Sequence, residues 1–161
     1  MSVQESLIAG FQGAYMVLKL NSAGLTEEKS REHPIEGASC VNWVLGHVLY
    51  VRSLFGPALG IKPEIGPDWE AVYNRGTSGK VDMGAGATLA DLEARFERSN
   101  AAVLSRIAEL TPAELDQIID HPAFGPKPLE QYLALLLMHE GYHIGQLGIL
   151  RRGLGLPPGL S

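Results

Sequence analysis

The chain has 161 residues, enough for one domain with its own hydrophobic core, and its single cysteine, Cys40, excludes an intrachain disulfide. A net charge of −5 argues against nucleic acid as the main partner, and 45% apolar with 19% charged residues is ordinary for a globular protein. The N-terminus lacks the basic start and apolar run of a signal peptide, and no stretch reaches the ~20 apolar residues that span a bilayer. We therefore expect a single cytoplasmic domain over residues 1–161, without a nucleic-acid or membrane partner.

The first two helices are expected over residues 2–23 and 39–55, where apolar residues recur at spacings of three and four. Ser39 is a good N-cap for the second of them, and the Gly-Pro pair at Gly56 ends it. Three polar residues interrupt the apolar character of that helix: Asn42, His47 and Arg52. The connector over residues 25–37 is predicted to be turn rather than helix, because it contains proline and glycine.

The segment from Gly56 to Ala87 is rich in glycine and proline and has no clear periodicity, which indicates a functional lid or a locally structured excursion. Residues 68–75 can form a short helix inside it. The dipeptide Gly79-Lys80 resembles part of a phosphate-binding loop, but the first glycine of that motif is missing and no strand precedes it. We therefore reject a phosphate-binding loop.

The third helix is expected from Thr88 to about Leu110, because Thr88 followed by Asp91 resembles a capping box and apolar residues then keep helical spacing. A brief turn of helix starts at Thr111, and a proline-rich stretch leads to Pro128 in the first turn of the last helix. No alternating strand pattern is evident. The sequence therefore predicts an all-α fold, with four long helices in an antiparallel bundle.

Within the last helix, the amphipathic stretch over residues 133–152 carries His139 and His143 one turn apart on the same, mostly apolar face. His47 points toward the interior with the large apolar residues of its own helix. Bundle cores build sites from facing helices, and neutral imidazole suits zinc, nickel, iron and copper, so these three histidines predict a metal site. The remaining histidines lie beside prolines in loops and are expected at the surface: His33 and His121.

The run His-Glu-Gly-Tyr-His also matches the HExxH motif of zinc peptidases, in which the glutamate is the general base. Zincins take their third ligand downstream, but the eighteen residues after His143 contain no His, Asp or Glu. The strands that support such a site are absent from the pattern as well. A peptidase is therefore not expected.

Several residues near this histidine face are candidates for a catalytic or supporting role. Glu140 can serve as a base or as an acceptor for a ligand N–H, although such a glutamate is more often a solvated charge. Gln146 lies one turn beyond His143 and is the better candidate to accept the free N–H of a ligand imidazole. Tyr142 and Asn42 also lie near the face.

Two further positions have alternative explanations. Cys40 lies two turns before His47 near a helix N-terminus, which favours a thiolate, but a small buried side chain is the commoner explanation. Arg151 and Arg152 fall in the last turn of the last helix, where cations complement the helix dipole. They can equally face an anionic substrate.

The runs NWVLGHVLYVR and HEGYHIGQLGILRRGLG together resemble the DinB-like (DinB/YfiT) metal-binding helix-bundle superfamily. The signature of that superfamily is an H-x3-H-x-G-Q run in the last helix with a third histidine in the second. The residues that match it are His47, His139, His143, Gly145 and Gln146. The likeness in helix order and in the RRGLGLP ending extends over nearly the whole chain.

The resemblance implies a four-helix bundle with an up-down-down-up connection, in which the segment after the second helix is the long crossover. It also implies a divalent transition metal (Zn, Ni, Fe or Mn) held by His47, His139 and His143, with the remaining positions open to water or substrate. Three protein ligands with open positions are typical of a catalytic rather than a structural metal.

Some relatives are thiol-dependent S-transferases or isomerases that use a low-molecular-weight thiol, and many have no assigned activity. The leading function implied by the resemblance is therefore a metal-dependent enzyme that acts on a small-molecule thiol and an electrophilic substrate. A non-catalytic metal-binding stress-response protein is the alternative, and a metal-dependent hydrolase is a further one. Relatives of this type are commonly dimers, so a homodimer is expected.

Overall fold

The computed structural model describes residues 2–121 and 124–160. The four long helices are α1 (Val3–Ser22), α3 (Val41–Leu59), α5 (Leu89–Glu109) and α7 (Leu129–Gly153). The shorter elements are α2 (Glu27–Arg31), α4 (Trp69–Tyr73), α6 (Pro112–Leu115), β1 (Ile118–His121) and β2 (Gly125–Pro128). The predicted four-helix bundle is confirmed. The centre of the predicted proline-rich stretch, residues 122–123, lies outside the described residues.

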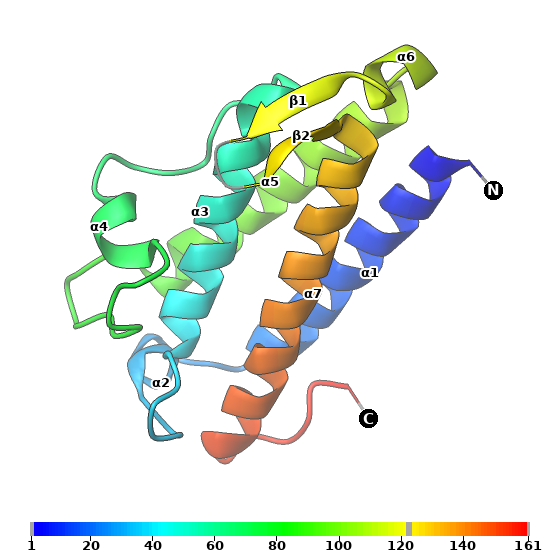
Figure 1. The fold of residues 1–161 in the computed structure, drawn as a ribbon. Coiled ribbons are helices and arrows are strands. Elements are labelled where there is room, and N and C mark those ends of the chain that lie inside the picture. Colours follow the sequence, from blue (N-terminus) through cyan, green and yellow to red (C-terminus); the bar gives the residue numbers. More distant parts are fainter. Residues whose placement is uncertain (1, 122–123, 161) are drawn as a thin grey trace.

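The directions of the long helices follow the predicted up-down-down-up order. α1 and α7 run the same way, and α3 and α5 run the opposite way (Figure 1). α3 packs against α5 and α7, and α1 packs against the same two helices. Because α3 and α5 are parallel, the chain returns along the bundle between them, and residues 60–88 form this crossover (Figure 1). Within the described ranges, none of the helices combines the length with the apolar content that a membrane-spanning segment needs.

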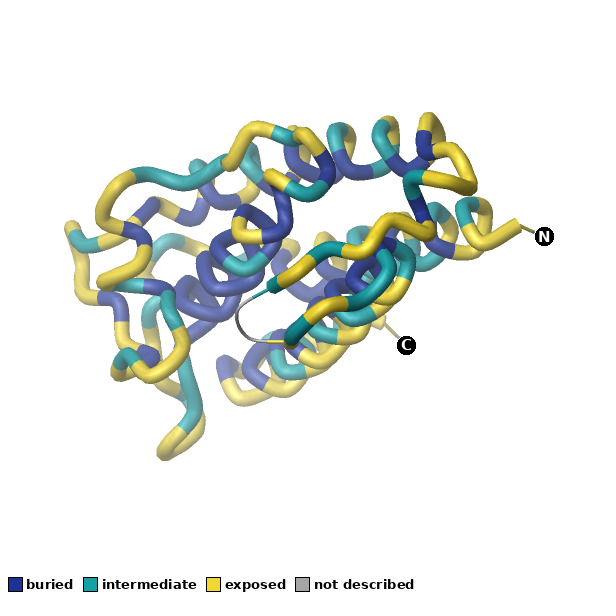
Figure 2. Tube along the Cα trace, turned by 45° about the horizontal axis from the view of Figure 1, so that its top comes forward, coloured by how far each residue is buried: buried dark blue, intermediate teal, exposed yellow. Residues whose placement is uncertain are grey.

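Buried residues occur along all four long helices (Figure 2). They form two apolar clusters. The cluster beside α4 includes Trp43, Val48, Tyr73, Leu92 and Leu147. The cluster beneath the hairpin includes Phe11, Phe55, Ile107, Tyr132 and Leu136. α3 contributes to both clusters, which explains why its sequence is apolar almost throughout.

The helix α2 lies inside the connector that was expected to be turn. Thr26 is its N-cap, because the Thr26 hydroxyl accepts a hydrogen bond from the N–H of Lys29 at 3.2 Å. The prediction of turn throughout residues 25–37 is therefore wrong over Glu27–Arg31. The proline and the glycine that motivated it come after this helix and do not interrupt it.

The expectation of a chain without strands is wrong at the hairpin. β1 and β2 pair antiparallel, with Ile118 opposite Pro128 and His121 opposite Gly125. Each strand has four residues, which is too short for an alternation of apolar and polar residues to stand out in the sequence. Pro128, expected in the first turn of the last helix, is instead the N-cap of α7.

The limits of α3 also differ from those expected. Its N-cap is Cys40 rather than Ser39, because the Cys40 sulfur accepts a hydrogen bond from the N–H of Trp43 at 3.4 Å. At its other end the helix runs through Pro57 instead of stopping there. It ends at Gly60, whose φ of 68° is a left-handed conformation that glycine adopts without strain.

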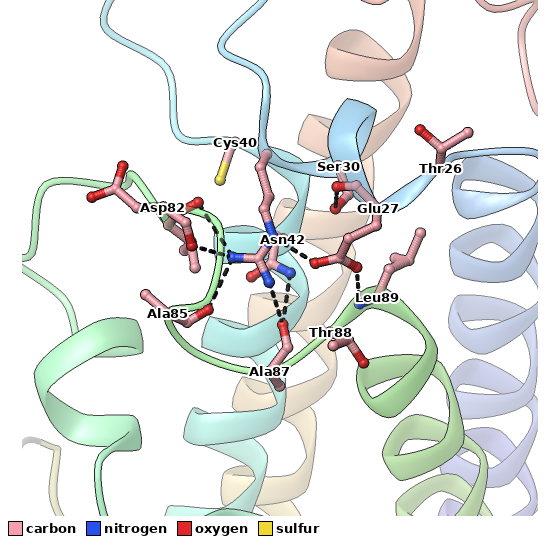
Figure 3. Close-up of polar contacts among 12 residues, drawn as sticks. Thr26, Glu27, Ser30, Cys40, Asn42, Asp82, Ala85, Ala87, Thr88 and Leu89 are labelled. Carbon is pink, nitrogen blue, oxygen red and sulfur yellow. Dashed lines mark hydrogen bonds and ion pairs between the residues drawn. The ribbon is translucent and has the colours of Figure 1, made fainter.

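Arg31 ties the end of the crossover to α2 and α5. Its guanidinium donates to backbone carbonyls of the crossover (Figure 3), those of Asp82 at 2.7 Å, Ala85 at 2.9 Å and Ala87 at 3.1 Å. It also pairs with the carboxylate of Glu27 at 2.5 Å, whose other oxygen accepts the N–H of Leu89 at the start of α5. The end of the crossover is thus locally structured.

Candidate metal centre

The packing of α3 against α7 brings His47, His139 and His143 together. One ring nitrogen from each of these side chains lies within 4.8 Å of the other two. The Nε2 atoms of His47 and His139 are 3.3 Å apart, and the ring centroids of His139 and His143 are 4.5 Å apart. The structure therefore places the three predicted ligands in one cluster, which we call the triad.

Two neighbours fix the ring of His47. The indole of Trp43 stacks on it, with centroids 4.6 Å apart and ring planes 7° from parallel. The backbone carbonyl of Tyr73, at the end of α4, accepts a hydrogen bond from its Nδ1 at 2.7 Å. Because a carbonyl oxygen can only accept, Nδ1 carries the proton and Nε2 carries the free lone pair.

His143 is oriented by its own helix. Its Nδ1 donates to the side-chain oxygen of Gln146 at 2.7 Å, so the hydrogen bond predicted for Gln146 is present. The free lone pair of His143 is therefore on Nε2 as well. Imidazole ligands of metals usually donate their second N–H in this way, because the hydrogen bond sets the tautomer and raises the basicity of the ligand nitrogen.

Burial lowers the pKa of all three imidazoles. For His139 the pKa falls to about 4, because burial and then the charges of His143 and His47 oppose its protonation. The three rings are therefore neutral near pH 7. This is the form in which imidazole binds a metal.

The contacts of His139 test whether the triad fits a metal ion. Its buried Nδ1 has no hydrogen-bond partner among the residues that the structure describes, and its Nε2 faces the lone-pair nitrogen of His47. Two nitrogens bonded to one metal at about 2.0–2.1 Å with a tetrahedral angle lie about 3.3 Å apart, which matches the observed 3.3 Å. The triad therefore fits a divalent transition metal.

A cavity of about 460 Å³ opens onto the triad. Besides the three histidines it is lined by Ser39, Trp43, Arg75, Met138, Tyr142 and Gln146, and none of these lining side chains is a carboxylate. The volume suits a small molecule. Three neutral ligands beside an open cavity are the arrangement of a metal that keeps a position for substrate.

Glu140, expected to be a solvated charge, is instead only 1% exposed. Both of its carboxylate oxygens accept hydrogen bonds from Arg52 of α3, at 2.7 and 2.8 Å. Arg52 in turn lies over the rings of Phe11 and Phe96. The expectation is wrong because the partner of Glu140 lies on another helix. The glutamate of the HExxH match is therefore held in an ion pair and does not line the cavity.

Cys40 is fully buried, and burial raises the pKa of its thiol. Of the two explanations for Cys40, the structure supports a small buried side chain rather than a thiolate. Arg151 is also buried, and its guanidinium donates to the backbone carbonyls of Ala23 and Pro157, which leaves it unable to face a substrate. Arg152 is exposed but does not line the cavity.

The two other candidates near the histidine face have different positions. Tyr142 lines the cavity and is 62% exposed, so it lies at the rim. Asn42 is buried outside the cavity. Its amide group donates to the carbonyl of Ala87 at 2.9 Å, and its side-chain oxygen accepts from the hydroxyl of Tyr73 at 3.0 Å. Asn42 thus supports the segment that orients His47.

The two remaining histidines lie apart from the triad. His33 is exposed, as predicted. His121, also expected at the surface, is half-buried and stacks on Phe55 with ring centroids 5.2 Å apart. The reason is the hairpin, which places His121 over the end of the bundle.

Five residues of the site were not predicted to belong to it: Ser39, Trp43, Tyr73, Arg75 and Met138. Tyr73 acts through its backbone carbonyl, which every residue has, so no side-chain pattern could identify it. Arg75 belongs to the crossover, where no periodicity shows which residues face the bundle. Met138 is adjacent to a predicted ligand, but its exposed position on the helix gave no sign of a role.

Replacing Gly46 by alanine is expected to destabilise the protein by about 1–3 kcal/mol, because overpacking strains a filled core. A Cβ at this position would lie 2.2 Å from two ring carbons of Tyr73, which is fully buried. Gly13→Ala in α1 is the matched control, since nothing lies within 4 Å of its Cβ, and alanine there adds about 0.5–1 kcal/mol of helix stability. Urea unfolding of both variants measures the difference, and equal stabilities would contradict the packing of Tyr73 on α3.

The family model described as the DinB superfamily matches residues 15–147. No curated protein matches the chain. A conserved protein from Enterococcus faecalis has a crystal structure that superposes with a TM-score of 0.75 at 18% identity, covering 96% of this chain and 98% of that one. YfiT from Bacillus subtilis, described as a probable metal-dependent hydrolase with an unusual four-helix bundle topology, superposes with a TM-score of 0.62 at 22% identity, covering 96% and 89%.

At these identities the two structural likenesses show the fold alone, and that fold agrees with the up-down-down-up bundle of Figure 1. The family match extends over well over half of the chain and includes all three histidines of the triad. The chain belongs to the DinB superfamily.

Proposed function

We propose that the triad holds one divalent metal ion and that the protein is a metal-dependent enzyme that transfers a small-molecule thiol to an electrophilic substrate. The observation that carries this proposal is the cavity beside the triad, which exposes three neutral imidazoles and is lined by no carboxylate. A metal bound there would supply Lewis acidity, which lowers the pKa of a thiol or of water. The pKa of a free thiol, about 8.5, is far closer to neutral than that of water, about 15.7, so a thiol needs less help from a base.

The residues around the triad prepare it for this role. The carbonyl of Tyr73 and the side-chain oxygen of Gln146 hold the protons of His47 and His143 on Nδ1, which keeps the Nε2 lone pairs free. The stacked indole of Trp43 prevents the His47 ring from turning. The imidazoles are thus positioned before a ligand arrives, so little free energy is needed to order them.

The expected reaction is a substitution at an electrophilic carbon. The thiol sulfur forms the new carbon–sulfur bond, and the bond to the leaving group breaks with its electron pair. The thiol proton leaves to solvent through the open side of the cavity, where Tyr142 lies at the rim. No oxidant or reductant is required.

A metal-dependent hydrolase is the second candidate, because YfiT is described as a probable enzyme of that kind. Hydrolysis usually uses a general base to accept a proton from water. The nearest carboxylate in the sequence motif, Glu140, is fully engaged by Arg52. This engagement favours the thiol-dependent reaction over hydrolysis.

The test uses the purified protein loaded with Zn, Ni, Fe or Mn, and the same protein stripped of metal by a chelator. Conjugation of 1-chloro-2,4-dinitrobenzene is measured with mercaptoethanol, cysteine and glutathione, and hydrolysis of p-nitrophenyl acetate is measured without thiol. Sustained conjugation that needs both metal and thiol supports the proposal. Metal-dependent hydrolysis alone replaces it with the hydrolase, and a metal-loaded protein without turnover in either assay supports the non-catalytic metal-binding alternative.

The homodimer stays a prediction. Its measurement is the mass of the protein in solution by sedimentation, for which two copies of the chain are expected per particle.

A further inference from the structure

We propose that the cavity beside the triad selects anionic substrates, and that Arg75 is the residue that positions their carboxylate or phosphate group. This inference rests on the proposed function, because it concerns the molecule that approaches the metal. It identifies the chemical class of the thiol or electrophile that enters the cavity.

The wall of the cavity carries positive charge. Histidine binds a metal as neutral imidazole, so the three protein ligands leave the charge of a divalent ion uncompensated. Arg75 is the one charged side chain among the residues that line the cavity, and it adds one positive charge to the two of the ion. In a chain whose net charge is −5, this wall is therefore locally electropositive.

The carboxylate nearest to the triad in the sequence does not neutralise this charge. Glu140 follows His139 in sequence, but its carboxylate lies in the bidentate ion pair with Arg52 and does not line the cavity. Arg75 itself is exposed, and its side chain has no hydrogen-bond or ion-pair partner within the part of the chain that the structure describes. Its guanidinium is therefore free to bind a ligand.

The backbone of Arg75 is held in place although its side chain is exposed. The indole N–H of Trp43 lies 3.0 Å from the carbonyl of Val72 and 2.8 Å from the hydroxyl of Thr77, which flank Arg75 on both sides. The carbonyl of Tyr73, two residues earlier, receives the hydrogen bond of His47. The turn that carries the arginine is thus tied to the helix that carries the first histidine.

These features fit the recognition of an anion. A guanidinium binds carboxylate or phosphate through two parallel hydrogen bonds, and an ammonium group would be repelled by both the arginine and the metal. The remaining wall includes the side chains of Trp43, Met138 and Tyr142, which can contact an apolar or planar portion of the same molecule. The expected substrate is therefore a small organic acid or phosphate ester.

The test measures thiol binding to the cobalt(II)-loaded protein through the sulfur-to-cobalt absorption band. Three probes of similar size differ in charge: 3-mercaptopropionate is an anion, 2-mercaptoethanol is neutral and cysteamine is a cation. For the unmodified protein we expect affinity to fall in that order. Arg75→Gln is expected to weaken the binding of 3-mercaptopropionate about tenfold, equivalent to about 1.4 kcal/mol. The affinity for 2-mercaptoethanol should not change.

Arg152→Gln is the matched control, because Arg152 is an exposed arginine that does not line the cavity. It should retain the preference for the anion, and both variants should keep the cobalt content of the unmodified protein. Equal binding of the three thiols, or an unchanged preference in Arg75→Gln, would overturn this proposal while leaving the proposed function intact. If none of the three thiols binds to the cobalt-loaded protein, the proposed function itself fails.

Discussion

Arg52→Met is expected to lower the free energy of unfolding by about 3–5 kcal/mol, because it leaves the charge of Glu140 buried without a partner. The two side chains are each 2% exposed, and two hydrogen bonds of 2.7 and 2.8 Å join them. Neither water nor another cation can replace the guanidinium without opening the packing of α3 against α7. Urea unfolding at pH 7, followed by circular dichroism, measures the loss.

The double variant Arg52→Met with Glu140→Met is the control that separates charge from packing. Removing both charges replaces the ion pair by apolar side chains, a change that is often neutral or even stabilising in other proteins. We therefore expect the double variant to be more stable than Arg52→Met alone. The free energy of unfolding is also measured for Glu140→Met alone. If the double variant loses as much free energy of unfolding as the two single variants together, the loss in Arg52→Met does not come from an uncompensated buried charge.

The ion pair also bears on the triad. Arg52 lies five positions after His47 on α3, and Glu140 directly follows His139 on α7. Because the pair fixes how these two helices are aligned, it keeps the histidines of both within reach of one ion. A metal affinity that falls in Arg52→Met and recovers in the double variant would show this positioning role.

His139→Ala is expected to weaken metal binding more than about 100-fold. Removing only the hydrogen-bond partner of a metal ligand already lowers metal affinity about 10–100-fold, and this change removes the ligand itself. The fold should survive, because His139 is half-buried and its Nδ1 has no partner among the described residues that the change would leave unpaired. Competition with a chromophoric zinc chelator measures the affinity. His33→Ala removes an exposed histidine outside the triad and should bind zinc like the unmodified protein.

A zinc affinity that is equal in His139→Ala and His33→Ala would contradict the triad as the binding site. The comparison is informative because both variants lose one imidazole from the same chain. Only the position of the lost ring differs between them.

Much of the fold was predictable because helical periodicity is a long-range pattern. The spacing of His139 and His143 places them on one face without any knowledge of the neighbouring helices. Each of the three polar residues that interrupt the apolar second helix makes a specific buried contact: Asn42, His47 and Arg52. Such interruptions are therefore a sequence signal, which was used for His47 and missed for Arg52.

The rest of the site depends on contacts that periodicity does not encode. The burial of Glu140 could not be predicted, because its partner Arg52 lies 88 positions away on another helix. Tyr73 and Arg75 lie in a crossover whose path is set by carbonyl contacts with Arg31, and backbone carbonyls are common to all residues. The hairpin was missed because four-residue strands carry too little pattern.

The proposed function requires that the triad binds one divalent metal ion. The most direct measurement is an anomalous difference map at the zinc absorption edge from crystals of the zinc-loaded protein. Metal binding by the triad predicts one strong peak per chain, at about 2.0–2.1 Å from one ring nitrogen of each of His47, His139 and His143. A map without a peak between these rings, or with its strongest peak on other side chains, would contradict it.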